Sequence, residues 1–200
     1  MATVTDDFNR ANGAPGANWS SALGLSDIVI ATNAIDPGNT ASRWAANTFD
    51  NDQAAWFQYV STRGTSGPMV RGDETVKTCY TCEWWQFDGE YGGFQLDCIK
   101  YVNGTKSTIG TSYQTYGALP GWVRVTATGT SIVVATSTDG AAWTDRVTVT
   151  DSAISTGSAG ILTAESAVDN WSATGAAAGG DPPAAPAVVW HRAHIINQLI

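Results

Sequence analysis

Apolar residues alternate with polar ones in short runs along this chain. In WVRVTAT (122–128) the two valines alternate with Arg124 and Thr126, and a second apolar run covers 132–135. A period of two residues is that of a β-strand with one buried face. The break at 128–130 contains turn-forming residues. These residues predict a β-hairpin.

The same pattern recurs over the rest of the chain, where β-branched and aromatic runs are interrupted by Gly, Asn, Asp and Pro. Before the C-terminus no segment has the spacing of an amphipathic helix. Further strands are predicted in 53–64, 67–72, 75–87, 92–102 and 146–150, with two more in 157–175. The composition of DNDQ (50–53) favours a loop instead. Strands with one apolar face each must bury it against a second sheet, so we expect an all-β sandwich of two antiparallel sheets.

The chain divides into three parts by composition. Residues 1–175 are long enough for one such sandwich. Residues 176–187, AAAGGDPPAAPA, carry no core-forming side chains and read as a linker with an extended, semi-rigid character. Residues 188–200 end the chain with an apolar arm, whose main apolar side chains are Val188, Trp190, Ile195, Ile196, Leu199 and Ile200.

Charge and the N-terminal sequence limit the partners. Only 14% of residues are charged and the formal net charge is -8, which disfavours nucleic acid and anionic membrane surfaces. MATVTDDFNR has neither the basic nor the apolar region of a signal peptide, and no apolar run approaches membrane-spanning length. We therefore expect synthesis in the cytoplasm, with no nucleic-acid and no membrane partner.

Three stretches together resemble the concanavalin A-like, or laminin G-like, jelly-roll superfamily: DDFNRANGAPGANW (6–19), GWVRVTATGTSIVVATSTDGAAW (121–143) and GSAGILTAESAVDNW (157–171). The resemblance implies a jelly roll over roughly residues 5 to 175, with the first and last strands side by side in one sheet. It also implies a candidate structural calcium site, with oxygen ligands from Asp6, Asp7, Asp169 and Asn170. Ordinary turn chemistry is the alternative explanation for these four residues. The opening stretch is also similar to segments of tailed-phage virion surface proteins.

Enzymatic motifs are missing from the sequence. Glycoside hydrolases on this fold carry Glu-x-Asp-x-x-Glu on one strand, which places an acid and a nucleophile on the same face, and no glutamate here has that spacing. A Ser-His-Asp grouping near a Gly-rich elbow is also missing. We therefore expect a non-enzymatic protein without a catalytic residue and without a cofactor other than the candidate calcium.

Aromatic residues are abundant, with nine tryptophans and six tyrosines. Aromatic rings beside Asn, Gln and Asp can hold the C–H faces of sugars, although core packing claims many such rings. Trp84 and Trp85 are adjacent, so in a strand they must face opposite sides. The glycan-binding candidates are Trp44, Trp56, Trp84, Trp85, Tyr91, Tyr113 and Tyr116.

The cysteines are Cys79, Cys82 and Cys98. Residues three apart in a strand face opposite sides, so Cys79 and Cys82 should diverge rather than chelate a metal. A hairpin closing at 88–92 could bring Cys82 near Cys98, so a disulfide between these two residues is one interpretation. Buried free thiols are the favoured one.

The apolar arm requires a docking place, since its exposure to water is unfavourable. Packing on its own sandwich is one outcome. The linker allows a longer reach, so we favour anchoring in another chain or in a second copy of this one. The leading hypothesis is a phage virion structural protein, either a capsid decoration or a minor tail surface module. Its partners would be other virion proteins or further copies of itself in a homo-oligomer. Cell-surface glycans would be a further ligand. The alternatives are a free carbohydrate-binding, lectin-like module and a glycosidase-like enzyme with an atypical site.

Overall fold

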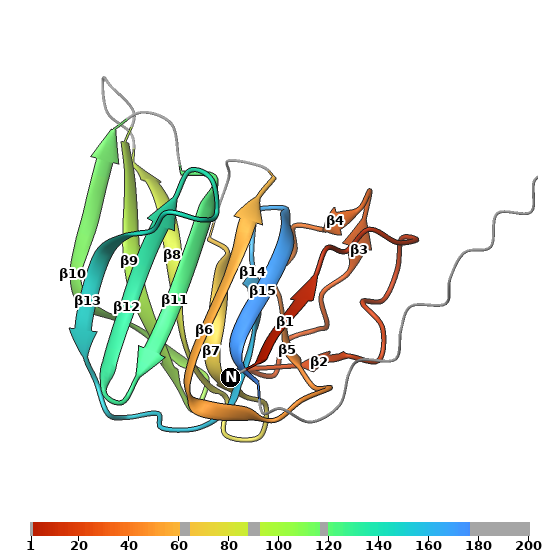
Figure 1. The fold of residues 1–200 in the computed structure, drawn as a ribbon, viewed down its shortest axis with the longest axis horizontal. Helices are drawn as coiled ribbons and strands as arrows, with labels where there is room; N and C mark the ends of the chain where they lie inside the picture. Colours follow the sequence, from red (N-terminus) through yellow and green to blue (C-terminus); the bar gives the residue numbers. More distant parts are fainter. Residues whose placement is uncertain (1, 61–64, 88–92, 117–119, 177–200) are drawn as a thin grey trace, which may run out of the picture.

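The computed structural model describes residues 2–60, 65–87, 93–116 and 120–176. Over these residues the protein is all-β: strands and turns account for the regular structure, and they build two antiparallel sheets packed face to face (Figure 1). Within the described ranges no helix has the length and apolarity that a membrane crossing requires. The predicted two-sheet antiparallel sandwich is confirmed.

The first sheet contains the two ends of the described chain. Its strands, in spatial order, are β13 (Thr144–Thr150), β12 (Ser131–Ser137), β11 (Trp122–Thr128), β6 (Phe49–Tyr59), β15 (Val168–Ala176), β4 (Ala34–Ile35) and β3 (Ile30–Ala31). The first strand, β1 (Ala2–Asp6), pairs with the last, β15, so that Asp6 lies opposite Trp171. Figure 1 shows these red and blue strands side by side, as the jelly-roll resemblance implied.

The second sheet lies behind the first in Figure 1. Its order is β10 (Thr105–Tyr116), β9 (Gly93–Val102), β8 (Thr78–Phe87), β7 (Gly67–Asp73), β14 (Ser158–Thr163), β5 (Thr40–Trp44) and β2 (Trp19–Ser21).

The sequence alternation produces the buried layer between the sheets. In β11, Val123 and Val125 are fully buried, while Arg124 and Thr126 lie on the face that points away from the second sheet. The neighbouring strands are in matching register, since Val123 lies opposite Phe57 of β6. We call the side of each sheet that points away from the other sheet its outer face.

Three tryptophans pack together inside the sandwich. Trp19 and Trp44 come from the second sheet and Trp171 from the first, with ring centroids 4.7–5.3 Å apart. Each indole N–H has an acceptor: a carboxylate oxygen of Asp6, the Asn47 side chain and the Gly160 carbonyl, respectively. This interior trio therefore buries large apolar area without leaving a polar group unsatisfied.

The cysteines lie as expected from strand geometry. Cys82 belongs to the main core between the sheets, whereas Cys79 packs in a small second apolar cluster with Met69 and Leu162. Cys82 lies directly opposite Cys98 in the β8–β9 pair. All three thiols are free and buried. Burial is the largest cause that raises the pKa of Cys98 to about 12, so its thiolate is disfavoured.

The structure corrects the sequence analysis in three places. Residues 50–53 are not a loop but part of β6, where Gln53 is buried and its amide donates to the carbonyls of Asp50 and Gly157. The strands β2 to β5 and β10 were not predicted. β15 extends through Ala176, the first residue assigned to the linker, and the remaining linker and the 188–200 arm lie outside the described residues.

Candidate functional site

A groove of about 780 Å³ opens on the outer face of the first sheet. It crosses β11, β6, β15 and β1, and reaches the loop after β1 at one end and the turn between β12 and β13 at the other. We call it the tryptophan groove; its lining residues are Thr5, Asp6, Asp7, Arg10, Asn18, Trp44, Trp56, Trp122, Asp139, Gly140, Asn170, Trp171 and Ser172.

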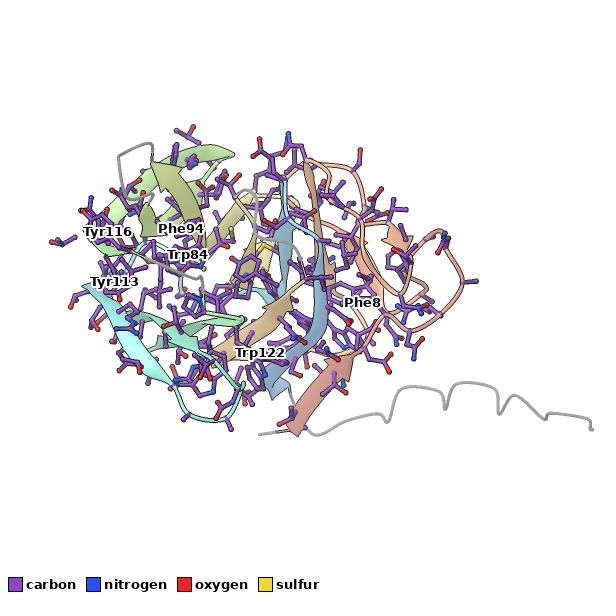
Figure 2. The ribbon with its side chains drawn as sticks, turned by 90° about the horizontal axis from the view of Figure 1, so that it is seen from above. Phe8, Trp84, Phe94, Tyr113, Tyr116 and Trp122 are labelled. Atoms are coloured by element: carbon purple, nitrogen blue, oxygen red, sulfur yellow. The ribbon has the colours of Figure 1, made fainter. Side chains whose placement is uncertain are left out.

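Two half-buried indoles provide the apolar surface of the tryptophan groove. Trp56 lies between Ala55 and Phe57, which are fully buried, so strand alternation turns its ring outward. Trp122 precedes buried Val123 and points to the same outer face, which Figure 2 shows at the lower side of the view. In the β6–β11 ladder Trp56 and Trp122 are diagonal neighbours, a spacing of roughly 7–8 Å. One small ligand can therefore contact both indole rings at the same time.

The turn between β12 and β13 holds the Trp122 ring in place. Gly140 has a φ of 75°, and a Cβ at this position would lie 2.9 Å from Cε2 of Trp122. The backbone therefore approaches the indole more closely than any other residue would permit. A glycine is required here for both reasons, conformation and contact.

Asp139 begins this turn and presents one free carboxylate oxygen. Its Oδ1 accepts hydrogen bonds from the hydroxyl of Ser137 at 2.8 Å and from the backbone N–H groups of Ala141 and Ala142 at 2.9 Å. Its Oδ2 accepts none from the described residues. The backbone N–H of Ala142, followed by those of Ala141 and the Ser137 hydroxyl, lowers the pKa of Asp139 to about 2, so it is ionised at neutral pH.

The opposite end of the groove is a fixed ion pair. Arg10 donates to both carboxylate oxygens of Asp6, at 2.6 and 2.8 Å, and also to the carbonyl of Pro15. Asp6 additionally accepts from the Phe8 backbone and from the indole of Trp19. The hydrogen bond to Asp6 is the largest cause that raises the pKa of Arg10. The pair is rigid because both partners are held by further bonds.

A β-bulge in β15 adds polar groups to the groove floor. The pairing with β6 shifts register between Asp169 and Ser172, and Asn170 takes a left-handed φ of 51°. The Asn170 amide donates to the side chain of Gln58 at 2.9 Å. Ser172 lies directly opposite Trp56 on β6. Asn170 and Ser172, on either side of buried Trp171, therefore both line the groove.

The arrangement combines flat apolar rings with fixed polar atoms. Such a groove suits a ligand that has an apolar face and several hydroxyl groups, because the rings cover the face and the rim atoms pair with the hydroxyls. Arg10 and the open oxygen of Asp139 supply a donor region and an acceptor at its two ends.

The sequence-predicted glycan candidates separate into different environments. Trp56 lines the tryptophan groove, while Trp44 contributes only to its floor and is 2% exposed. Trp84 is buried between the sheets, where its ring is edge-on to Phe94 (Figure 2). Trp44 and Trp84 are therefore core residues rather than ligand platforms. Both residues occupy strand positions whose side chains point toward the core.

The remaining candidates lie on or near the second sheet. Trp85 is 46% exposed on its outer face, with the ammonium of Lys106 5.2 Å from the ring centroid. Tyr113 packs against the core and under the guanidinium of Arg146, and Tyr116 is 67% exposed at the end of β10. Tyr91 lies outside the described residues. The candidates thus do not form a single site.

Several groove residues were not predicted: Arg10, Asn18, Trp122, Asp139, Gly140 and Ser172. For Trp122 the signal was present, since it shares its strand phase with the polar Arg124 rather than with the buried valines. Asp139 and Gly140 lie in the turn between β12 and β13. Their role depends on the long-range approach of the turn to Trp122, which local sequence does not encode.

The calcium candidates come together in part. Asp7, Asp169 and Asn170 line a small pocket of about 200 Å³ together with Asn9 and Asn33. Burial raises the pKa of Asp169, and the neighbouring charge of Asp7 raises it further.

Carboxylate and amide oxygens are the donors that calcium prefers, so the donor chemistry of this pocket fits. Asp6 does not fit, because both of its oxygens are occupied by Arg10 and other donors. Among the described residues no group of three or more acidic, His or Cys side chains has a metal-binding arrangement. The calcium site stays a prediction.

Comparison with known proteins identifies the fold only. No family model matches the chain, and no curated protein matches it. Among solved structures, the carbohydrate-binding module CBM66 from Bacillus subtilis is similar with a TM-score of 0.52 and 16% identity, over 78% of this chain and 94% of that one. The GH43 protein BlXynB from Bacillus licheniformis has a TM-score of 0.52 and 14% identity, over 86% of this chain but 39% of that one.

These two likenesses agree with the observed topology, in which two antiparallel sheets enclose one core and the first and last strands pair. The protein has the concanavalin A-like jelly-roll fold.

Proposed function

We propose that this protein is a carbohydrate-binding, lectin-like module and that the tryptophan groove is its binding site. The fold is shared with a carbohydrate-binding module, and the likeness covers 94% of that module. The observation that carries the proposal is the outward-facing pair Trp56 and Trp122 on neighbouring strands, enclosed by hydrogen-bonding side chains.

The physical basis is the match between groove and sugar. A pyranose ring has a C–H face that packs on an indole, and hydroxyl groups around its edge that require donors and acceptors. Trp56 and Trp122 offer two adjacent stacking positions, which favours an oligosaccharide over a monosaccharide. The ion pair Asp6–Arg10 and the carboxylate of Asp139 are already held by the protein, so little ordering is needed when a ligand binds.

A binding titration with alanine variants tests the proposal. Soluble polysaccharides of several backbone types would be titrated into the full chain, with calorimetry and tryptophan fluorescence as readouts. Trp56→Ala and Trp122→Ala should each weaken binding at least tenfold, because covering an aromatic side chain contributes about 1.5–3 kcal/mol. Both variants should fold normally, since neither ring belongs to the interior trio.

The matched control is Trp85→Ala, which removes an exposed tryptophan from the outer face of the other sheet. This variant should bind as the wild type does. Loss of binding in Trp85→Ala, with unchanged binding in both groove variants, would place the site on the second sheet. Failure of every polysaccharide to bind would contradict the carbohydrate-binding function.

We further propose that the protein is not a hydrolase. The feature most like a catalytic pair is Glu83 opposite Asp97 in the β8–β9 ladder. Both are buried, Glu83 is paired with Lys106, and Asp97 accepts from the amide of Gln95. These carboxylates are therefore withheld from a large substrate. Release of reducing sugar from a polysaccharide panel, abolished by Glu83→Gln, would overturn this conclusion.

The virion hypothesis has less support than the binding function. Neither reported likeness is to a virion protein, and the arm (188–200) lies outside the described residues. Anchoring in other virion proteins or in a homo-oligomer, and residence in a virion, therefore stay predictions from the arm sequence. Sizing the full chain against one that ends at Ala176 tests them, and identical monomers would argue against anchoring.

A further inference from the structure

The described residues that line the tryptophan groove carry more negative than positive charge. Asp6, Asp7 and Asp139 are its carboxylates, and Arg10 is its single cation. Arg10 is bound at both nitrogens to Asp6, so these two charges cancel locally. Three carboxylates against one guanidinium leave the lining with an excess of negative charge, although Asp7 also interacts electrostatically with Arg10.

The nearest further cation by strand position is occupied elsewhere. Arg124 lies directly opposite Trp56 on β11, but its guanidinium stacks on the ring of Trp143, with Cζ 4.5 Å from the centroid. It does not line the groove. Burial lowers the pKa of Arg124, and the carboxylate of Asp145 opposes this shift only in part. Arg124 therefore contributes no cation to the groove lining itself.

Asp139 is the best placed of these carboxylates to meet a ligand. Three hydrogen bonds to Oδ1 fix its orientation, while Oδ2 has no partner among the described residues. It adjoins Gly140, whose backbone lies against the Trp122 ring. A sugar stacked on Trp122 therefore has a fixed acceptor beside it.

We propose that the tryptophan groove selects neutral glycans over carboxylated or sulfated ones, and that Asp139 is the specificity-determining residue. Its open Oδ2 accepts a hydrogen bond from a sugar hydroxyl, and its charge repels an anionic substituent on the same sugar. This inference rests on the proposed carbohydrate-binding function and names the ligand class of that site.

The size of the effect follows from simple electrostatics. Two like unit charges 4 Å apart in bulk water change affinity roughly fivefold, and more strongly near a protein surface. With this excess of carboxylates in the groove, we expect the neutral ligand to bind at least tenfold more tightly at low ionic strength. Screening at high salt should reduce this ratio.

Matched polysaccharide pairs with one backbone test the inference. Suitable pairs are dextran with dextran sulfate, laminarin with sulfated laminarin, and hydroxyethylcellulose with carboxymethylcellulose. Dissociation constants of the full chain would be measured at about 50 and about 500 mM NaCl, because this change shortens the Debye length about threefold. The neutral member of the binding pair should be favoured at least tenfold at the lower salt concentration.

Asp139→Asn keeps the Oδ1 acceptor and removes the charge. We expect it to weaken binding of the neutral member a few fold and to lower the neutral-to-anionic ratio severalfold, with the remainder of the preference left to Asp7. The matched control is Asp73→Asn, which neutralises another turn aspartate, one that accepts from the Val76 backbone and does not line the groove. This control should leave the ratio unchanged. Circular dichroism confirms that both variants are folded.

Different failures have different meanings. Equal or tighter binding of the anionic member by the wild type, or an unchanged ratio in Asp139→Asn, overturns the inference while the carbohydrate-binding function stands. If no member of any pair binds, the proposed function fails and this inference fails with it.

Discussion

Trp171 and Trp56 lie on neighbouring strands of the same sheet but in opposite surroundings. Ser172 is opposite Trp56 in the β15–β6 ladder, so Trp171, the preceding residue, points inward where Trp56 points outward. Trp171 is fully buried in the interior trio, where it forms part of the groove floor, and its N–H is bonded to the Gly160 carbonyl. Trp56 is half-buried in the tryptophan groove.

The difference shows how one residue type serves two purposes in this fold. The interior trio joins the two sheets through ring contacts and satisfied N–H groups, so its effect is on stability. The groove pair covers little of the core and leaves ring surface open, so its effect is on binding. Strand phase, rather than residue type, decides which purpose applies.

The largest expected effect comes from removing one tryptophan from each group. Trp171→Ala should lower the free energy of unfolding by about 3–5 kcal/mol, because it leaves a large cavity in the core. Urea unfolding followed by far-UV circular dichroism measures the loss. Trp122→Ala is the partner variant and should lose less than about 1 kcal/mol. Similar losses in the two variants would mean that the groove pair is structural as well.

A smaller effect is expected at the glycine that holds Trp122. Gly140→Ala should cost about 1–2 kcal/mol of stability from its positive φ, and should also weaken glycan binding severalfold because the new methyl group displaces the ring. Gly129→Ala is the matched control: its φ is also positive, at 54°, but nothing lies within 4 Å of its added Cβ. It should lose stability without losing binding. A binding loss in both variants would indicate a general loosening of the turns.

Calcium removal tests the small pocket lined by Asp7, Asp169 and Asn170, the last of which precedes Trp171 in the sequence. If Asp7, Asp169 and Asn170 bind the ion, calcium at ten times its dissociation constant should stabilise the protein by about 1.4 kcal/mol. Thermal unfolding in calcium and in EDTA measures this, with magnesium as the control ion. Asp169→Asn should abolish the calcium shift. Identical unfolding curves in calcium and EDTA would leave ordinary turn chemistry as the role of these residues.

The smallest expected effect is a loss of stability at low pH, when Asp151 becomes protonated. Burial opposes ionisation of Asp151, but hydrogen bonds from Lys100 and Tyr80 outweigh it and lower its pKa below 3.8. A carboxyl whose pKa is lower in the folded state than in the unfolded state stabilises the protein when the pH is above the unfolded-state pKa. This stabilisation is lost as the pH falls through the folded-state pKa. Urea midpoints should therefore decline below about pH 4. Asp151→Asn should flatten that decline, whereas Asp73→Asn should not.

The sequence predicted the fold because its information is local and repeated. Alternation in β11 placed Val123 and Val125 in the core, and adjacency of Trp84 and Trp85 required opposite faces; the structure confirms both. The short strands β2 to β5 escaped prediction because two to five residues give too little alternation to detect. The strand phase of 50–53 was hidden by polar residues, since Gln53 is buried through hydrogen bonds rather than apolar contact.

The site was less predictable than the fold. Trp56 was named from its residue type, but Trp122, Asp139 and Arg10 join it only through pairings between distant strands and turns. Aromatic content alone cannot separate core rings from ligand rings. The useful criterion is strand phase combined with the neighbours across the ladder, and the second of these requires the topology.

The pairing of β1 with β15 has a consequence for how the chain folds. It joins residues at the two ends of the described chain, so nearly the whole sandwich must be ordered before this ladder can close. We therefore expect β1 to dock late and slowly. Until it does, the β15 edge exposes unpaired backbone groups, and intermediates at high concentration should associate through that edge.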